Sequence, residues 1–163
     1  MELSELLLTD QEAMKLIKVF KTAMEKHFKT LSYGDKGKIT MISFEDKREF
    51  CLNYFYAESK KIFNFLDCTT HHVLFRVTLS DSIHFHKNAD GTRVRGNRIN
   101  IFSEQEFYER QDGSTYMKCF PLPFENIKNS DDFLAVFTDI CDYANIEKQG
   151  KINLEIHNQN TLF

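Results

Sequence analysis

The hydrophobic pattern of the first quarter of the chain follows the spacing of an α-helix. Thr9 and Glu12 form a capping box, a common signal at the start of a helix. The apolar residues that follow recur three or four positions apart, and they are Ala13, Leu16, Ile17, Phe20, Met24 and Phe28. Gly34 can adopt the left-handed conformation that ends many helices. This pattern predicts a long N-terminal helix over residues 9–33.

Between residues 37 and 120 the pattern changes to the alternation that is typical of β-strands. Six segments alternate or are rich in β-branched and aromatic residues, and they are 38–43, 49–56, 61–66, 72–79, 98–102 and 114–120. Most of them are separated by short polar turns, which favours antiparallel pairing between neighbours. We therefore predict a mainly antiparallel sheet of five to six strands.

Helical spacing returns after the strands. Ser130 can cap a helix whose first turn contains Asp131 and Asp132, where negative charge is favourable. The apolar stripe behind this cap predicts a helix over residues 130–143. Residues 151–156 can add an edge strand, and we expect the residues after it to form a loose C-terminal tail.

The order of helix, several strands and helix is typical of an α+β protein. A chain of 163 residues can bury a hydrophobic core of its own, so we treat residues 1–163 as a single domain. We expect an antiparallel sheet over about 37–120, a long N-terminal helix and a C-terminal helix. The residues that we expect to be largely buried are Phe20, Met24, Phe50, Leu52, Val77, Leu79, Phe133 and Phe137.

Composition narrows the class of protein. Hydrophobic residues make up 42% of the chain and charged residues 28%, which is ordinary for a globular protein. No apolar run approaches the roughly 18 residues that a membrane-spanning helix needs. The N-terminal segment MELSELLLTDQEAM is acidic and lacks the basic region and cleavage site of a signal peptide. We therefore expect a cytoplasmic protein that has no membrane partner.

The cysteine pattern argues against metal and disulfide chemistry. Cys51, Cys68, Cys119 and Cys141 are far apart, and no Cys-x-x-Cys pair or histidine stands at a metal-finger spacing. We interpret them as reduced thiols that pack as small hydrophobic side chains. No sequence signature of a cofactor is present, so we expect neither a metal nor a cofactor.

Charge is unevenly distributed along the chain, although the net charge is only −3. Residues 60–102 contain seven basic and three acidic residues, whereas residues 103–163 contain five basic and eleven acidic residues. The basic middle and the acidic last third either form opposed surfaces or pair with each other inside the fold.

The segment 76–102 concentrates the basic residues, because it contains four of the six arginines. The turn residues Asn88-Ala89-Asp90-Gly91 predict a hairpin connection within it. The candidate binding residues around this turn are His84, His86, Lys87, Arg93, Arg95 and Arg98. Arginine presents a planar fork of donors that suits phosphate or carboxylate groups, and the neighbouring Phe85 and Phe102 could stack on bases if they are exposed. We therefore expect nucleic acid, a nucleoprotein or an acidic protein surface as the partner.

The sequence is also compatible with two other functions. In a toxin-like endoribonuclease, His86 would be the general base, His84 or another histidine the acid, and Arg93, Arg95 or Arg98 would stabilise the charged phosphorane. The 2′-hydroxyl of RNA would be the nucleophile, so this reaction would need no metal. Alternatively, the 16 phenylalanines could supply an apolar patch for a homodimer or another homo-oligomeric interaction domain.

Four segments together resemble a family of small uncharacterised bacterial and phage proteins, whose pattern reads R-L-D…H-x-N-P-D-G…H-x-H-I-Y. The segments are RVTL from Arg76, HKNADG from His86, RINIF from Arg98 and CDYANI from Cys141. The resemblance covers about residues 45–147. Ala89 stands where the family has proline, Thr78 where it has an acid, and Arg98 and Asn100 where it has paired histidines.

The resemblance implies no established activity, but it implies a protein encoded by a phage or a mobile element. Together with the basic hairpin, it favours a small non-enzymatic binding protein that engages nucleic acid or a host defence complex, as an inhibitor would. The ribonuclease and the homo-oligomeric interaction domain stand as the alternatives.

Overall fold

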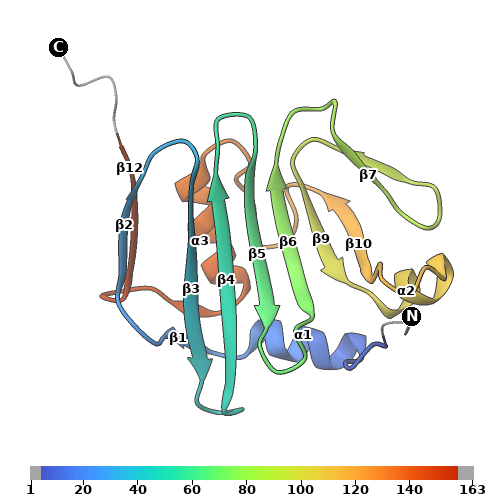
Figure 1. Ribbon diagram of the computed structural model, residues 1–163, viewed down its shortest axis with the longest axis horizontal. Coiled ribbons are helices and arrows are strands. Elements are labelled where there is room, and N and C mark those ends of the chain that lie inside the picture. The colour runs from blue at the N-terminus through green and yellow to red at the C-terminus, as the bar shows by residue number, and fades with distance from the viewer. Residues whose placement is uncertain (1–4, 158–163) are drawn as a thin grey trace.

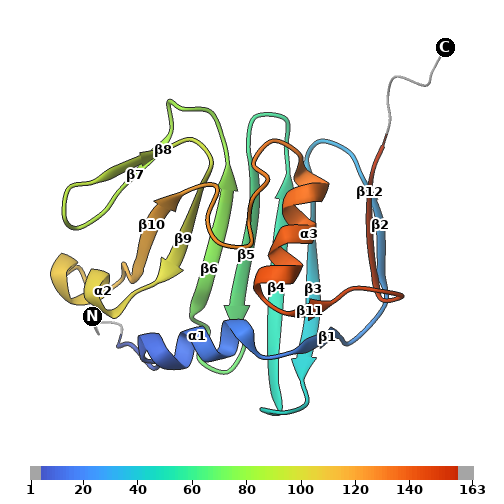
Figure 2. The ribbon, with the colours of Figure 1, turned by 180° about the vertical axis from the view of Figure 1, so that it is seen from behind.

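An eight-stranded sheet forms the centre of the computed structural model, which describes residues 5–157 (Figures 1 and 2). The strands, in spatial order, are β10 (Met117–Pro121), β9 (Arg98–Phe102), β6 (Val73–Leu79), β5 (Lys61–Asp67), β4 (Arg48–Tyr56), β3 (Asp35–Ser43), β1 (Lys21–Ala23) and β11 (Ile146–Glu147). Neighbouring strands are antiparallel, except that β1 and β11 are parallel. The mixed α and β content and the mostly antiparallel sheet confirm the predicted class.

Two smaller strand pairs and three helices complete the described part of the chain. β2 (His27–Leu31) pairs in parallel with β12 (Ile152–Ile156), and β7 (Phe85–Lys87) pairs with β8 (Arg93–Arg95) in a hairpin. The helices are α1 (Asp10–Lys18), α2 (Glu104–Arg110) and α3 (Phe133–Tyr143). In Figure 2, α3 lies in front of the sheet and α1 runs along one end of its strands.

The prediction of a long N-terminal helix was wrong. The capping box at Thr9 and Glu12 is present, but α1 ends at Lys18 because Val19 adopts an extended conformation. Residues 21–31 then form β1 and β2, whose pairing with distant strands overrides the local helical spacing. The side chains of Phe20, Met24 and Phe28 are exposed, at 48%, 46% and 56% respectively.

The sheet is also larger than the five to six strands that we predicted. The short strands β1 and β11 extend it on one side, and neither was recognised in the sequence. Residues 152–156 do form a strand, but it pairs with β2 outside the main sheet. Helix α3 begins at Phe133 with Asp132 as its cap, two residues later than the cap predicted at Ser130. Helix α2, capped by Ser103, was not predicted.

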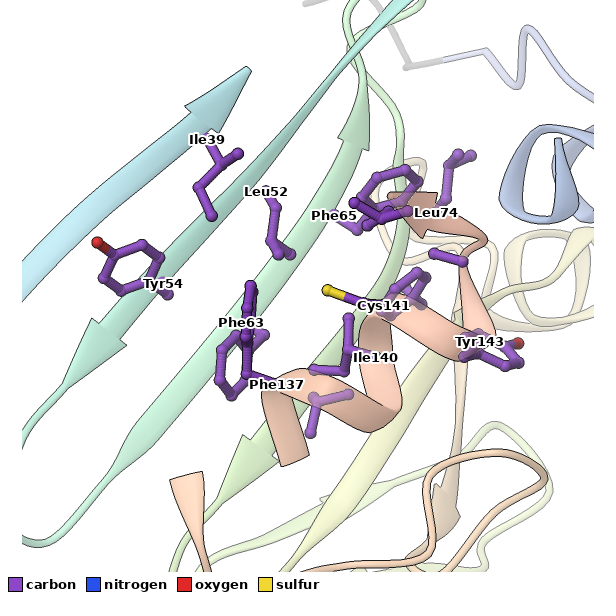
Figure 3. Packing of buried hydrophobic residues seen from close by; sticks show 14 of the residues in the cluster. Ile39, Leu52, Tyr54, Phe63, Phe65, Leu74, Phe137, Ile140, Cys141 and Tyr143 are labelled. Atoms are coloured by element: carbon purple, nitrogen blue, oxygen red, sulfur yellow. The ribbon is translucent and has the colours of Figure 1, made fainter. Parts of the chain in front are cut away.

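One face of the sheet, which we call the inner face, packs on the helices through aromatic side chains. Phe63 of β5 stacks on Phe133 and Phe137 of α3, with ring centroids 4.6 and 6.0 Å apart. Figure 3 shows Leu52 and Phe65 on the same side of the sheet as Phe63, directed toward α3. Six of the eight residues predicted to be buried are in this core, namely Phe50, Leu52, Val77, Leu79, Phe133 and Phe137.

A lysine is buried within this aromatic core. The Nζ atom of Lys21 donates hydrogen bonds to the carbonyl oxygens of Ile17, Val19 and Ala144, each at 2.7 Å. It also lies over the rings of Phe50 and Phe65, 5.0 and 5.2 Å from their centroids. Burial lowers the pKa of Lys21 to about 7, while the three carbonyl acceptors favour its charged form. Lys21 therefore joins the C-terminal ends of α1 and α3, where positive charge is favourable.

We call the opposite face of the sheet the outer face, and within residues 5–157 no helix lies over its central strands (Figure 1). Side chains alternate along each strand, so Cys51, Asn53 and Phe55 of β4 lie on this face. The hairpin of β7 and β8 folds over this face at the side of β9 and β10. The hairpin and the uncovered strands beside it make the outer face the candidate binding surface.

Candidate binding surface

The hairpin places its basic residues on one side by simple strand alternation. Its register pairs Phe85 with Arg95, His86 with Val94, and Lys87 with Arg93. Phe85, Lys87, Arg93 and Arg95 therefore share one side, and all four are exposed. His86 and Val94 point the other way, toward the body of the protein. We call the four exposed residues the hairpin surface.

The turn between the two strands is built as the sequence predicted. The amide of Gly91 donates to the carbonyl of Asn88 at 2.9 Å, and Gly91 has the positive φ of +91° that this turn requires. The carboxylate of Asp90 accepts hydrogen bonds from the backbone and the hydroxyl of Thr92. These hydrogen bonds lower the pKa of Asp90, so the turn holds a charged carboxylate at its tip.

The hairpin is anchored to the sheet by a buried asparagine. The side-chain amide of Asn88 donates to the carbonyl of Cys119 on β10 at 3.0 Å, and its oxygen accepts from the Cys119 amide at 2.9 Å. The backbone amide of Ala89 donates to the buried carboxylate of Glu106, which also pairs with Arg110 at 3.2 Å. The hairpin is thus fixed on β10 and α2 by polar groups that are shielded from water.

His86 belongs to this anchoring and not to the exposed surface. Its Nδ1 atom lies 3.3 Å from the Asn100 side-chain amide, and its Nε2 atom is buried without a hydrogen-bond partner among the described residues. Burial lowers the pKa of His86, and the positive charges of Arg110 and Arg98 lower it further. The NH₂ group of Asn100 is a donor, so Nδ1 is assigned as the acceptor and carries no proton. This assignment and the lowered pKa both favour the neutral imidazole.

His84 and Arg98 lie at the base of the hairpin with partners of their own. The Nδ1 atom of His84 is 2.9 Å from a carboxylate oxygen of Asp81. Arg98 donates to the hydroxyl of Ser80 at 2.9 Å and to the carbonyl of Gly96 at 2.7 Å. These two residues therefore brace the loops that lead into and out of the hairpin.

On the exposed side, two arginines flank one aromatic ring. The guanidinium carbons of Arg93 and Arg95 lie 5.1 and 4.9 Å from the centroid of the Phe85 ring. Lys87, Arg93 and Arg95 form no ion pair within residues 5–157. Their charges are available to an anionic ligand, and cation–π contact holds the arginine groups beside the ring.

The residues suggested for ribonuclease chemistry do not all share one side of the hairpin. His86 faces the sheet while Arg93 faces solvent from the paired strand, and His84 is engaged by Asp81. General acid–base catalysis needs both groups within hydrogen-bond reach of one substrate position. Arg93 therefore lies on the opposite side of the hairpin from His86, whereas the charge of Arg98 is close enough to lower the pKa of His86.

Sequence reasoning did not identify the buried groups that hold the hairpin, namely Asn88, Asn100 and Glu106. Asn88 stands in a typical turn sequence, and nothing in its spacing marks it as buried. Glu106 lies on a helix that we did not predict. Only the packing of the hairpin on β9, β10 and α2 reveals the roles of these side chains.

Two cysteines that are distant in sequence meet beside the outer face. The sulfur atoms of Cys51 and Cys68 lie 3.4 Å apart, and all four cysteines are free thiols. Burial raises the pKa of Cys68 to about 12 and that of Cys119 to about 11, which keeps both thiols protonated.

Within residues 5–157, no three histidine, cysteine or acidic side chains gather as a metal site. In the same range, no helix combines the length and the apolar character needed to cross a bilayer.

Comparison with known proteins gives one match. The model of a family of unknown function (DUF6978) matches residues 8–146. No curated protein and no solved structure matches the chain.

Proposed function

Because the chain belongs to the family DUF6978, whose function is unknown, we propose from the geometry that it is a non-enzymatic binding protein for nucleic acid. The contact would be made by the hairpin surface of Phe85, Lys87, Arg93 and Arg95. The phage or mobile-element setting and the role as an inhibitor of host defence stay predictions from the resemblance.

One observation carries this proposal. Two guanidinium groups flank the exposed Phe85 ring, and no carboxylate neutralises them among the described residues. Guanidinium groups bind phosphate oxygens with two parallel hydrogen bonds, and an aromatic ring offers a face on which a base can stack. The anchored turn supports the proposal further, because a rigid surface loses little conformational entropy when it binds.

The test is a binding titration with a variant that removes the three positive charges, Lys87→Ala, Arg93→Ala and Arg95→Ala. Anisotropy of a short fluorescein-labelled oligonucleotide should report tight binding by the wild type and at least a tenfold loss in the variant. The dependence of affinity on salt should become shallower by roughly 0.7 units per lost phosphate contact on a single strand.

A matched control variant removes three positive charges at the opposite end of the sheet. It replaces Lys26, Lys29 and Lys151, which are exposed near β2 and β12 (Figure 1). This control should bind like the wild type. Equal losses in both triple variants would show that total charge decides binding, and the proposal for the hairpin surface would be wrong.

A further inference from the structure

The outer face carries two rows of side chains that cross five strands in register. One row contains Lys36, Phe55, Ile62, Thr78 and Arg98, which are consecutive partners on β3, β4, β5, β6 and β9. The next row contains Lys38, Asn53, Asn64, Arg76 and Asn100. Strands are spaced by about 4.8 Å, so each row extends over roughly 19 Å.

The β3 end of these rows is hollowed. A shallow cavity of about 660 Å³ lies over β3, β4 and β5, and its outer-face lining is Lys36, Lys38, Asn53, Phe55, Ile62 and Asn64. None of the residues that line it is acidic. We call these six residues the open face.

The open face combines three kinds of chemistry. Phe55 and Ile62 are direct cross-strand partners and form a half-exposed apolar floor. Asn53 and Asn64 stand opposite each other in the next row, and Lys36 and Lys38 border the cavity with exposed side chains. The apolar floor suits the face of a base, and the amide groups suit its hydrogen-bonding edge. The lysines suit the phosphate of the same nucleotide.

Arg76 orients one of the two amides. Its Nε atom donates to the side-chain oxygen of Asn64 at 3.0 Å. The oxygen of Asn64 is thereby used within the sheet, and its NH₂ group remains to donate to a ligand. A fixed donor beside an apolar floor suits the recognition of a base edge.

We propose that the open face binds a single strand of nucleic acid, with one base stacked on Phe55. This inference rests on the proposed function, because the same strand would continue to the hairpin surface. The second row continues across Arg76 of β6 to Asn100 of β9, which contacts His86 on the inward side of the hairpin, so this row leads from the open face to the hairpin. The bases of a duplex are already stacked on each other, and only an unpaired base can lie on the sheet.

Charge complementarity favours this occupant over a protein strand or helix. The open face carries two lysines, Arg76 lies beside it, and no carboxylate lines the cavity. A polyanion with flat rings at regular intervals matches both the charges and the apolar floor. DNA and RNA share this chemistry, and the experiment therefore includes both.

The test compares Phe55→Leu with Phe55→Tyr, using labelled single-stranded DNA, single-stranded RNA and duplex DNA of one sequence. Leucine retains an apolar side chain but removes the ring, whereas tyrosine retains the ring. Phe55→Leu should lower single-strand affinity roughly fivefold to 100-fold, the range found when a stacked aromatic is removed. Phe55→Tyr should bind like the wild type, and duplex affinity should change in neither variant.

A second readout reports the stack directly. An oligonucleotide that contains 2-aminopurine should change its fluorescence on binding to the wild type and to Phe55→Tyr, but much less on binding to Phe55→Leu. Circular dichroism and thermal melting confirm that each variant is folded. The ratio of DNA to RNA affinity identifies which of the two nucleic acids the open face prefers.

The outcomes separate the two proposals. If the hairpin triple variant loses binding while Phe55→Leu binds single strands like the wild type, the open-face inference is overturned and the proposed function stands. If Phe55→Leu loses single-strand binding while the hairpin variant retains it, the hairpin surface is not the contact and the open-face inference stands. A wild type that binds no nucleic acid overturns both and shows that the face serves a different partner.

Discussion

The inner and outer faces of the sheet are made by alternate residues of the same strands, yet they differ completely in chemistry. Along β4, Phe50, Leu52 and Tyr54 are buried against the helices, whereas Asn53 and Phe55 between and after them are half-exposed. The inner face is filled by aromatic rings in contact with each other. The outer face has amides, lysines and one half-exposed ring over β3 to β5. In this sheet, the first set of residues determines stability and the second set is free to determine recognition.

The largest expected effect tests this division directly. Phe63→Ala removes a fully buried ring that stacks on Phe133, so we expect a loss of about 3–5 kcal/mol in the free energy of unfolding. Phe55→Ala on the neighbouring strand and the other face should cost about 1 kcal/mol or less. Urea unfolding followed by circular dichroism measures both values.

Both variants replace a phenylalanine ring by a methyl group, so they remove the same volume. The difference between their free energies of unfolding therefore reports the difference between the two faces. Equal losses would show that Phe55 also supports the core. The separation of the two faces into a stabilising and a recognising set would then be untenable.

The second effect concerns the polar group that the inner face buries. Lys21→Met keeps a long side chain but leaves the carbonyl oxygens of Ile17, Val19 and Ala144 without their donor. We expect a loss of roughly 2–3 kcal/mol, because buried acceptors without donors are costly. Lys15→Met, on the exposed side of α1, should leave the unfolding midpoint unchanged. A more stable Lys21→Met variant would mean that desolvation of the ammonium outweighs its three hydrogen bonds.

The smallest effect concerns the part of the outer face that is covered. Asn88→Ala removes both hydrogen bonds to the backbone of Cys119, and we expect a loss of about 1–2 kcal/mol. Hydrogen exchange of the Cys119 amide should accelerate, which locates the change at the hairpin anchor. Asn126→Ala, an exposed position, provides the comparison. Unaltered exchange at Cys119 would indicate that Glu106 and Asn100 alone hold the hairpin.

The central strands could be predicted from the sequence because their local pattern and their tertiary environment agree. The segments 49–56, 61–66 and 98–102 match β4, β5 and β9 to within one residue at each end. Their dense aromatic and β-branched composition favours strands, and their pairing is with close neighbours. Alternation also placed Arg93 and Arg95 on the same side of the hairpin.

The N-terminal region could not be predicted in the same way, for a reason visible in its spacing. Phe20, Met24 and Phe28 are four residues apart, and a spacing of four fits one face of a helix and equally one face of a strand. What decides between them is the pairing of β1 with β11, more than a hundred residues away. Similarly, the inward position of His86 depends on how the hairpin docks on β9, which no local pattern encodes.

The contacts of Lys21 have a consequence for the order in which the chain folds. β1 pairs with Ile146 through Lys21 itself, and the Lys21 amine also needs the carbonyl of Ala144. At ordinary rates of translation, these partners leave the ribosome on the order of ten seconds after Lys21 does. Until then Lys21 lacks its partner at the end of α3, and the sheet has an open edge at β1. Closure of the domain is therefore a late event, and we expect a nascent chain that is halted before Ala144 to be a substrate for chaperones.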